Sequence, residues 1–304
     1  MSKPRAGTTF QSPKINVLVS FPYWEKNATS MKRVFDDHDP AMFRLLIDSG
    51  AFSAWTLGQE ISLAGYMRFI RSLPSTWDVS CIQLDVVGNP VKTKENWLRM
   101  LDAGIDALPV FTRGGDFEVL DEYYAQSPLV MFGGIVQGKG NKNYIRHFME
   151  NNQGRPVHWL GFSDHNFMKH YRPFSVDSST VTSAQRFGDF MYYAGAGKVK
   201  KLGKEAFVTE PPREFVQSCL RVGLTLKEIA LLGQAKHWRG GADPTSWDTG
   251  KGIASLMVHI HQVYRGMDLE RAIGTRYYIA QTTTATVGAL FTSYEFLKER
   301  GRLV

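Results

Sequence analysis

Residues 43–53 read F-R-L-L-I-D-S-G-A-F-S, and their pattern is the starting point for predicting the fold. An apolar run rises to Asp48, and the chain then breaks through Ser49 and Gly50. A run of this length before a glycine is typical of a buried strand that ends in a turn. Because an unpaired charge is costly in an apolar surrounding, Asp48 needs a partner or a function at this strand end.

Similar segments recur along the first two thirds of the chain, and helical patterns lie between most of them. The expected strands are 15–21, 43–49, 79–87, 107–112, 129–136, 157–163, 174–179 and 188–194. Alternation of this kind, repeated about eight times, predicts an α/β fold, a (β/α)8 TIM barrel. An open doubly wound sheet is the alternative, although no G-x-G-x-x-G follows the first strand.

The composition of the chain changes at about residue 209. We expect residues 1–208 to form the catalytic barrel and residues 209–304 to form a helix-rich C-terminal extension. The extension is expected to pack on the barrel as part of the same domain. Between the two lies the basic segment 197–204, G-K-V-K-K-L-G-K, which is typical of an exposed loop.

Charge and composition narrow the class of protein. The formal net charge of +7 favours a polyanionic partner, although such an excess also occurs in proteins that bind none. No apolar run is long enough to cross a bilayer, and the N-terminus lacks a signal peptide, so we expect a cytoplasmic protein with no membrane partner. Cys81 and Cys219 are the only cysteines, which makes neither a disulfide framework nor a four-cysteine zinc site.

Three aspartates fall at the ends of expected strands: Asp48 on the second, Asp85 on the third and Asp177 on the seventh. In a TIM barrel these ends meet at one mouth, so we expect the three carboxylates to share a site. Convergent carboxylates indicate either glycosyl chemistry or a site for a hard cation. Phe52 follows the turn after Asp48, where its ring either faces a planar ligand or joins the core.

The motifs that follow these strands resemble those of the tRNA-guanine transglycosylases, which are (β/α)8 barrels. The matching stretches are D-S-G-A-F-S (48–53), Q-L-D (83–85), V-F-T-R-G-G (110–115), F-G-G-I-V (132–136), W-L-G-F-S (159–163) and F-S-V-D-S (174–178). The family's C-x-C-x-x-C zinc site is absent, so no metal or other cofactor is expected. The stretches D-S-G-A-F-S and S-V-D-S-S-T are similar to the phage and bacterial branch that inserts 7-deazaguanine bases into DNA.

The resemblance implies a double displacement in which guanine in DNA is exchanged for a 7-deazaguanine base such as preQ0. It implies that Asp177 attacks C1′ of the deoxyribose and that Asp48 is the general acid and base. Asp85 would accept hydrogen bonds from the base, the Gly134 N–H would meet its carbonyl oxygen, and Phe52 would stack on its face.

The family's usual glutamine after the fourth strand is missing, and Gln137 is the candidate to take over its contacts to the base. Basic residues around the mouth are candidates for phosphate contacts, since the substrate is a polyanion. These nucleic-acid-binding candidates are Arg113, Lys139, Lys198, Lys200 and Lys201.

Alternatives with other partners remain. The same chemistry on tRNA is the first, and a carboxylate-based glycoside hydrolase is the second. A barrel that binds nucleic acid without catalysis is the third. Members of the family often form homodimers, but the sequence shows no interface signature. A phage-encoded member would act in the host cytoplasm.

Overall fold

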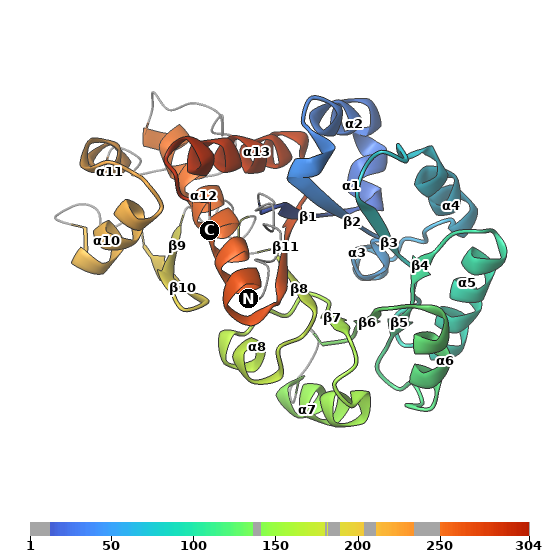
Figure 1. The fold of residues 1–304 in the computed structure, drawn as a ribbon. Coiled ribbons are helices and arrows are strands. Elements are labelled where there is room, and N and C mark those ends of the chain that lie inside the picture. Colours follow the sequence, from blue (N-terminus) through green and yellow to red (C-terminus); the bar gives the residue numbers. More distant parts are fainter. Residues whose placement is uncertain are drawn as a thin grey trace, which may run out of the picture.

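The computed structural model describes residues 13–135, 141–179, 181, 189–203, 211–233 and 250–303. They form an α/β fold in which a nearly closed, barrel-like sheet of parallel strands is surrounded by helices (Figure 1). The fold class predicted from the strand–helix alternation is therefore confirmed. The helix-rich C-terminal region packs beside the barrel, also as predicted.

The barrel strands are β1 (Ile15–Ser20), β2 (Phe43–Asp48), β3 (Val79–Ile82), β4 (Ala107–Leu108), β5 (Val110–Phe111), β6 (Val130–Phe132), β7 (Val157–Trp159), β8 (Ser175–Ser178) and β11 (Arg276–Gln281). Their order in the sheet is β4-β3-β2-β1-β11-β8-β7-β6-β5. Only Pro109 separates β4 from β5, because proline has no N–H to give to a ladder. The two halves of this segment pair with β3 and β6, which brings the two edges of the sheet together.

The helices that connect the strands lie outside the barrel (Figure 1). They are α1 (Phe21–Lys26), α2 (Ala28–Asp36), α3 (Ala51–Thr56), α4 (Leu63–Ser72), α5 (Pro90–Asp102), α6 (Val119–Gln126), α7 (Asn141–Asn152) and α8 (His165–Tyr171), with a short 3₁₀ turn η1 (Pro40–Met42). Side-chain caps start several of them. Ser62 accepts a hydrogen bond from Gly65 N at α4, and Asn89 accepts one from Lys92 N at α5, as N-cap residues do.

The eighth strand is not where the sequence predicted it. The expected strand at 188–194 corresponds to β9 (Phe190–Gly195), which pairs antiparallel with β10 (Lys198–Leu202) in a separate sheet. The eighth barrel strand is β11, which lies in the region expected to be helical and pairs in parallel with β1 and β8. The barrel sheet therefore does not end at residue 208.

The remaining helices are α10 (Arg213–Arg221), α11 (Leu226–Leu232), α12 (Gly250–Ile273) and α13 (Thr284–Glu299). Helix α12 lies between the barrel and the small β9–β10 sheet (Figure 1). Its residues from Gly252 to Met267 are buried, because the helix contacts β9 on one side and β11 and α13 on others. None of the described helices combines the length and the apolar character needed to span a membrane.

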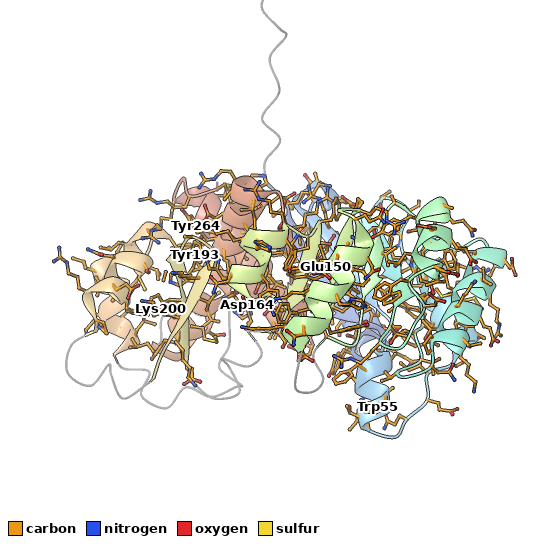
Figure 2. All side chains as sticks on the ribbon, turned by 90° about the horizontal axis from the view of Figure 1, so that it is seen from below. Trp55, Glu150, Asp164, Tyr193, Lys200 and Tyr264 are labelled. Atoms are coloured by element: carbon orange, nitrogen blue, oxygen red, sulfur yellow. The ribbon has the colours of Figure 1, made fainter. Side chains whose placement is uncertain are left out.

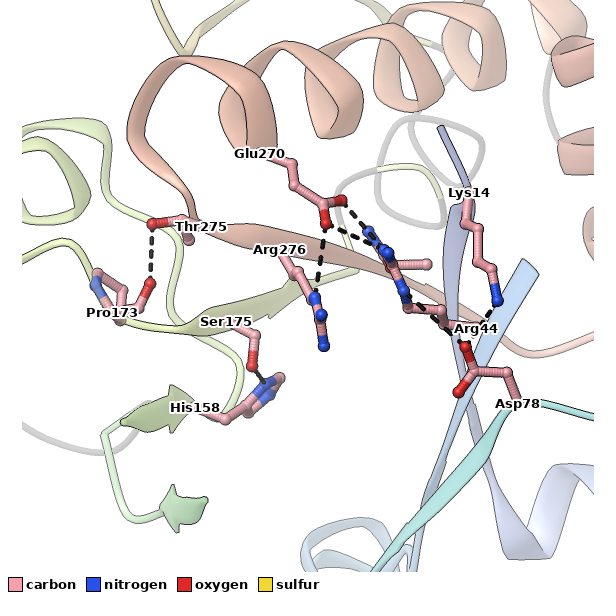
Figure 3. A network of polar contacts seen from close by, with 10 residues as sticks. Lys14, Arg44, Asp78, His158, Pro173, Ser175, Glu270, Thr275 and Arg276 are labelled. Carbon is pink, nitrogen blue, oxygen red and sulfur yellow. Dashed lines mark hydrogen bonds and ion pairs between the residues drawn. The ribbon is translucent and has the colours of Figure 1, made fainter. Parts of the chain in front are cut away.

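Side chains alternate along the strands and fill two cores. The smaller core is inside the barrel and consists of Leu18, Leu46, Ile82, Val110, Met131 and Tyr278. At the amino ends of the strands the barrel is closed by charged groups instead. Glu270 of α12 accepts a hydrogen bond from Arg44 Nη1 at 3.1 Å and lies 3.5 Å from Arg276 Nε (Figure 3). The carboxyl ends of the strands are the face at which a barrel of this kind carries its site.

Candidate active site

Asp48 is held by the turn that follows β2. Its Oδ2 accepts hydrogen bonds from Ser20 Oγ at 2.7 Å and from Gly50 N at 3.1 Å. Ser20 is its register partner on β1, so two neighbouring strands orient the carboxyl group. Asp48 is an inward-facing residue, since Leu46, two residues before it, belongs to the core inside the barrel.

Gly50 makes the turn beside Asp48 possible. Its φ is +79°, in the left-handed region that favours glycine. A Cβ at this position would lie 2.5 Å from Pro22 Cδ, closer than carbon atoms approach. The backbone therefore passes close to α1 here, and Gly50 N can reach the Asp48 carboxyl.

Asp85 lies just beyond β3, on the strand next to that of Asp48. Its Oδ1 accepts a hydrogen bond from Ser49 Oγ at 3.3 Å. Helix α5 holds the backbone around it, because Thr93 Oγ1 accepts from Val86 N at 2.9 Å and Asn96 Nδ2 donates to Leu84 O at 3.0 Å. Asp85 is thus fixed although it follows the last paired residue of its strand.

Asp177 projects inward from β8 and is buried, with 8% of its surface exposed. Its Oδ1 accepts hydrogen bonds from Gly161 N at 2.7 Å and from His158 Nε2 at 3.1 Å. No hydrogen bond from the described residues reaches its Oδ2. One oxygen of this carboxyl group is therefore held by two donors, and the other has no donor among the residues that the structure describes.

The three aspartates are linked electrostatically through Asp48. Burial raises the pKa of Asp48, and the charge of Asp177 raises it further, against the opposing effect of the Ser20 hydrogen bond. Burial and the charge of Asp48 raise the pKa of Asp85 to about 7. Asp48 is thus coupled to both of the other carboxyl groups, and a proton can be held at this mouth near neutral pH.

Phe52 lies on α3, immediately after the Gly50 turn. Its side chain is 46% exposed, so the alternative that it joins the core is wrong. Trp55 on the same helix is 55% exposed and projects from the lower edge of the molecule in Figure 2. The centroids of the two rings are 6.1 Å apart. This end of the barrel thus presents two exposed aromatic side chains on the helix that starts beside Asp48.

Gly134 is exposed in the segment after β6, with a φ of +70°. A Cβ here would lie 3.0 Å from Arg113 Cβ, so the two segments pass close to each other. Arg113 itself stacks on the ring of Tyr144 at 4.4 Å and donates a hydrogen bond to Asn141 Oδ1 at 3.2 Å. Its guanidinium group is therefore partly committed to protein contacts.

The predicted residues Gln137 and Lys139 lie outside the described residues. Lys198, Lys200 and Lys201 are exposed on β10, which is not part of the barrel. Two of them are paired: Lys200 Nζ lies 2.8 Å from a Glu214 oxygen and Lys201 Nζ 2.6 Å from Asp189 Oδ2.

The turn between β9 and β10 approaches the end of the barrel at α8. Arg265 of α12 donates to Gly197 O at 3.2 Å and to Ser163 O at 3.4 Å, which ties the turn to the segment before α8. His165 at the start of α8 has a pKa lowered by burial and by the charges of Lys198 and Arg265. Of the three predicted lysines on β10, Lys198 is therefore the one placed beside the mouth segments.

Sequence reasoning missed His158. It lies on β7 and is fully buried, and its two ring nitrogens face Ser175 Oγ at 2.8 Å and Asp177 Oδ1 at 3.1 Å. Its place in V-H-W (157–159), between two residues of the outer core, was the signal that it faces the interior of the barrel.

Cys81 and Cys219 are buried free thiols on β3 and α10. Among the residues that the structure describes, no group of three or more His, Cys, Asp or Glu side chains is arranged to hold a metal ion. Comparisons of the chain with protein-family models, with curated proteins and with solved structures find no match. The functional argument therefore depends on the geometry of the site.

Proposed function

We propose that this protein is a transglycosylase that exchanges guanine in DNA for a 7-deazaguanine base. The observation that supports it best is the placement of Asp48, Asp85 and Asp177 at the carboxyl ends of barrel strands, where Asp48 interacts electrostatically with the other two and both described donors to Asp177 reach Oδ1 rather than Oδ2. Two carboxyl groups of opposite protonation state are what glycosyl transfer through a covalent intermediate requires.

In the first half of the reaction, Asp177 Oδ2 forms a bond to C1′ of the deoxyribose as the bond from C1′ to the guanine nitrogen breaks. The departing base takes up a proton from Asp48. The raised pKa of Asp48 suits it to this role, because a general acid must hold its proton near the working pH.

In the second half, Asp48 accepts a proton from the incoming 7-deazaguanine base. The base nitrogen then bonds to C1′ from the side that guanine left, and the bond between C1′ and Asp177 Oδ2 breaks. Two inversions restore the original configuration, as in retaining glycosidases. No oxidant, reductant or other cofactor is needed for this balance.

Recognition of the base is assigned to Asp85 and Phe52. The Asp85 carboxylate accepts hydrogen bonds from the amino and ring N–H groups, and the exposed Phe52 ring stacks on the purine face. The N–H of Gly134, an exposed residue, donates to no acceptor among the described residues and would meet the base carbonyl oxygen.

A polyanionic substrate is supported by the net charge of +7 and the basic candidates Arg113, Lys139, Lys198, Lys200 and Lys201. DNA is preferred to tRNA because D-S-G-A-F-S and S-V-D-S-S-T resemble the branch that modifies DNA. The target nucleotide must leave the stack to reach the buried Asp177 carboxyl, since a duplex hides C1′.

The test is incorporation of a radiolabelled 7-deazaguanine base by the full-length chain, offered DNA or tRNA in parallel. We expect label in DNA, and a loss of about 10³-fold or more in Asp177→Asn, since the amide is no nucleophile. Asp164→Asn is the matched control. Asp164 caps α8 by accepting from Asn166 N and Phe167 N, and asparagine keeps such a cap.

Other outcomes separate the alternatives. Incorporation of label into tRNA alone would show that the exchange acts on tRNA instead of DNA. Release of sugar from oligosaccharides, without dependence on nucleic acid, supports a glycoside hydrolase. If the wild type binds DNA but exchanges no base, and Asp177→Asn binds DNA equally well, the result supports a barrel that only binds nucleic acid.

A further inference from the structure

His158 is enclosed inside the barrel beside Asp177. It is fully buried, with Nδ1 2.8 Å from Ser175 Oγ and Nε2 3.1 Å from Asp177 Oδ1. Figure 3 shows the contact with Ser175, its register partner on β8. The ring of Tyr278 packs against it at 5.9 Å between centroids. Both ring nitrogens thus have a polar partner in an otherwise tightly packed interior.

These partners determine where the protons of His158 lie. An ionised Asp177 can only accept, so His158 Nε2 must carry a hydrogen. In the neutral ring Nδ1 then accepts from the Ser175 hydroxyl group, and in the cation Nδ1 donates to it. Because the Ser175 hydroxyl group can rotate to serve both cases, the ring presents a donor to Asp177 in either protonation state.

Charged groups that act on this pair come from several strands. Asp177 is the direct partner, Asp48 of β2 interacts electrostatically with both Asp177 and His158, and Tyr278 of β11 has a pKa raised to about 12 by burial. Arg276 and Arg44 lie nearer the amino ends of the strands and act on Tyr278.

We infer that His158 is a positioning residue that keeps the bond between Asp177 and the sugar short-lived; this rests on the proposed function. His158 and Gly161 both donate to Oδ1, so that Oδ2 is the oxygen that bonds to C1′. In the covalent state Asp177 is an ester and Oδ1 is its carbonyl oxygen. When the C1′–Oδ2 bond breaks, the electron pair returns to the carboxylate, and Oδ1 regains charge against two donors already in place.

A donor stabilises a carboxylate more than an ester carbonyl, because hydrogen bonds to charged acceptors are the stronger ones. His158 therefore favours the free carboxylate over the ester. Its loss should leave more of the enzyme in the covalent form, although exchange as a whole becomes slower. A side chain that merely supports the fold would reduce the covalent form and the exchange together.

The experiment measures the covalent adduct between the full-length chain and guanine-containing DNA after denaturation, and then its discharge by added free base. In His158→Leu we expect a larger adduct fraction than in the wild type and discharge slower by about 10- to 100-fold, the effect of losing one charge-assisted hydrogen bond. His158→Gln is the rescue variant, because its amide N–H can take the place of Nε2–H, and should behave close to the wild type.

Ser175→Ala gives a second measurement that does not depend on the folding of His158→Leu. It removes the hydrogen-bond partner of His158 Nδ1, so the ring is held less firmly against Asp177 and the adduct fraction should rise in the same direction by a smaller factor. Circular dichroism of each variant checks that it folds.

The outcomes separate this inference from the proposed function. A wild-type chain that gives no adduct dependent on Asp177 overturns both. A wild type that gives the adduct, together with folded His158 or Ser175 variants whose adduct fraction falls or stays the same, overturns the role of His158 alone.

Discussion

Asp48 and Asp85 lie at the ends of neighbouring strands, and the charge of Asp48 adds to the effect of burial in raising the pKa of Asp85 to about 7. Ser49 is the residue between Asp48 and Gly50. Its hydroxyl group donates a hydrogen bond to Asp85 Oδ1 and so connects the two strand ends. Asp85, to which recognition of the base is assigned, and Asp48, to which proton transfer is assigned, are thus coupled.

A pH dependence of base binding follows from this coupling. If ionised Asp85 accepts the hydrogen bonds of the base, affinity for the free base should rise between about pH 6 and pH 8. In Asp48→Asn the neighbouring charge is gone, so the rise should move to lower pH. Calorimetric titration of the free base at a series of pH values measures both. An unchanged profile in Asp48→Asn would show that the two groups are not coupled.

The free energy of unfolding should depend on Asp85 in the opposite direction, falling as the pH rises. The pKa of Asp85 in the folded state is raised to about 7 from an ordinary value of 3.8. The contribution of Asp85 to the stability of the folded state is therefore fully present below pH 3.8 and is lost as the pH rises through 7. We expect Asp85→Asn to be more stable than the wild type at high pH by about 4 kcal/mol, and similar in acid. Urea denaturation at the two extremes measures the difference; a variant less stable at high pH would contradict it.

The Gly50 turn can be tested against a second left-handed glycine. Gly58 has a φ of +63° with open space around its Cβ position, whereas a Cβ at Gly50 meets Pro22 at 2.5 Å. Gly58→Ala should cost about 1 kcal/mol of strain, and Gly50→Ala about 1–3 kcal/mol more because of the clash. Thermal and urea denaturation give the free energies of unfolding. Equal costs would mean that α1 moves away freely.

Glu270 should stabilise the amino end of the barrel. It binds Arg44 of β2 through both carboxyl oxygens, at 3.1 and 3.2 Å, and also faces Arg276 of β11. We expect Glu270→Gln to lower the free energy of unfolding by about 1–3 kcal/mol. Glu295→Gln, which removes one side of an exposed pair with Lys298, should cost less than about 0.5 kcal/mol. Similar losses of stability in the two variants would show that the contacts of Glu270 with Arg44 and Arg276 add little to the free energy of unfolding.

Phe52 should affect binding more than folding. Because its ring is 46% exposed, Phe52→Ala should leave stability nearly unchanged but weaken binding of the base by about 1–3 kcal/mol through lost stacking. Leu57→Ala, at a position 69% exposed just past the same helix, is the control and should change neither. Base titrations and denaturation curves are the two measurements. Weakened binding in both variants would point to a general effect on α3.

The first seven barrel strands were predictable because each is a short apolar run between a helical pattern and a turn signal. The eighth was not. Residues 190–195, F-M-Y-Y-A-G, come at the expected spacing and have the composition of a strand, yet they pair with β10 outside the barrel. The true eighth strand, R-Y-Y-I-A-Q (276–281), lies between two long helices, and only its pairing with β1 and β8 reveals its place.

The carboxylates of the site were predictable because a charge at the end of an apolar run is conspicuous. His158 was not, because a single histidine in a strand says little until the strand is paired. Its register with Ser175 brings its ring between Ser175 and Asp177, a relationship that no local pattern encodes. The β10 lysines illustrate the reverse case, since two of them have acidic partners that sequence reasoning did not assign.

Strand β11 lies between β1 and β8. Strand β1, the first to be synthesised, therefore gains its second neighbour only after β11, the last barrel strand in the chain, has been made. Seven strands can assemble during synthesis, but ring closure has to follow translation of the long α12 segment. Until β11 is made, the edges of β1 and β8 that it pairs with have no partner in the barrel sheet, and such edges are sites at which another chain can pair.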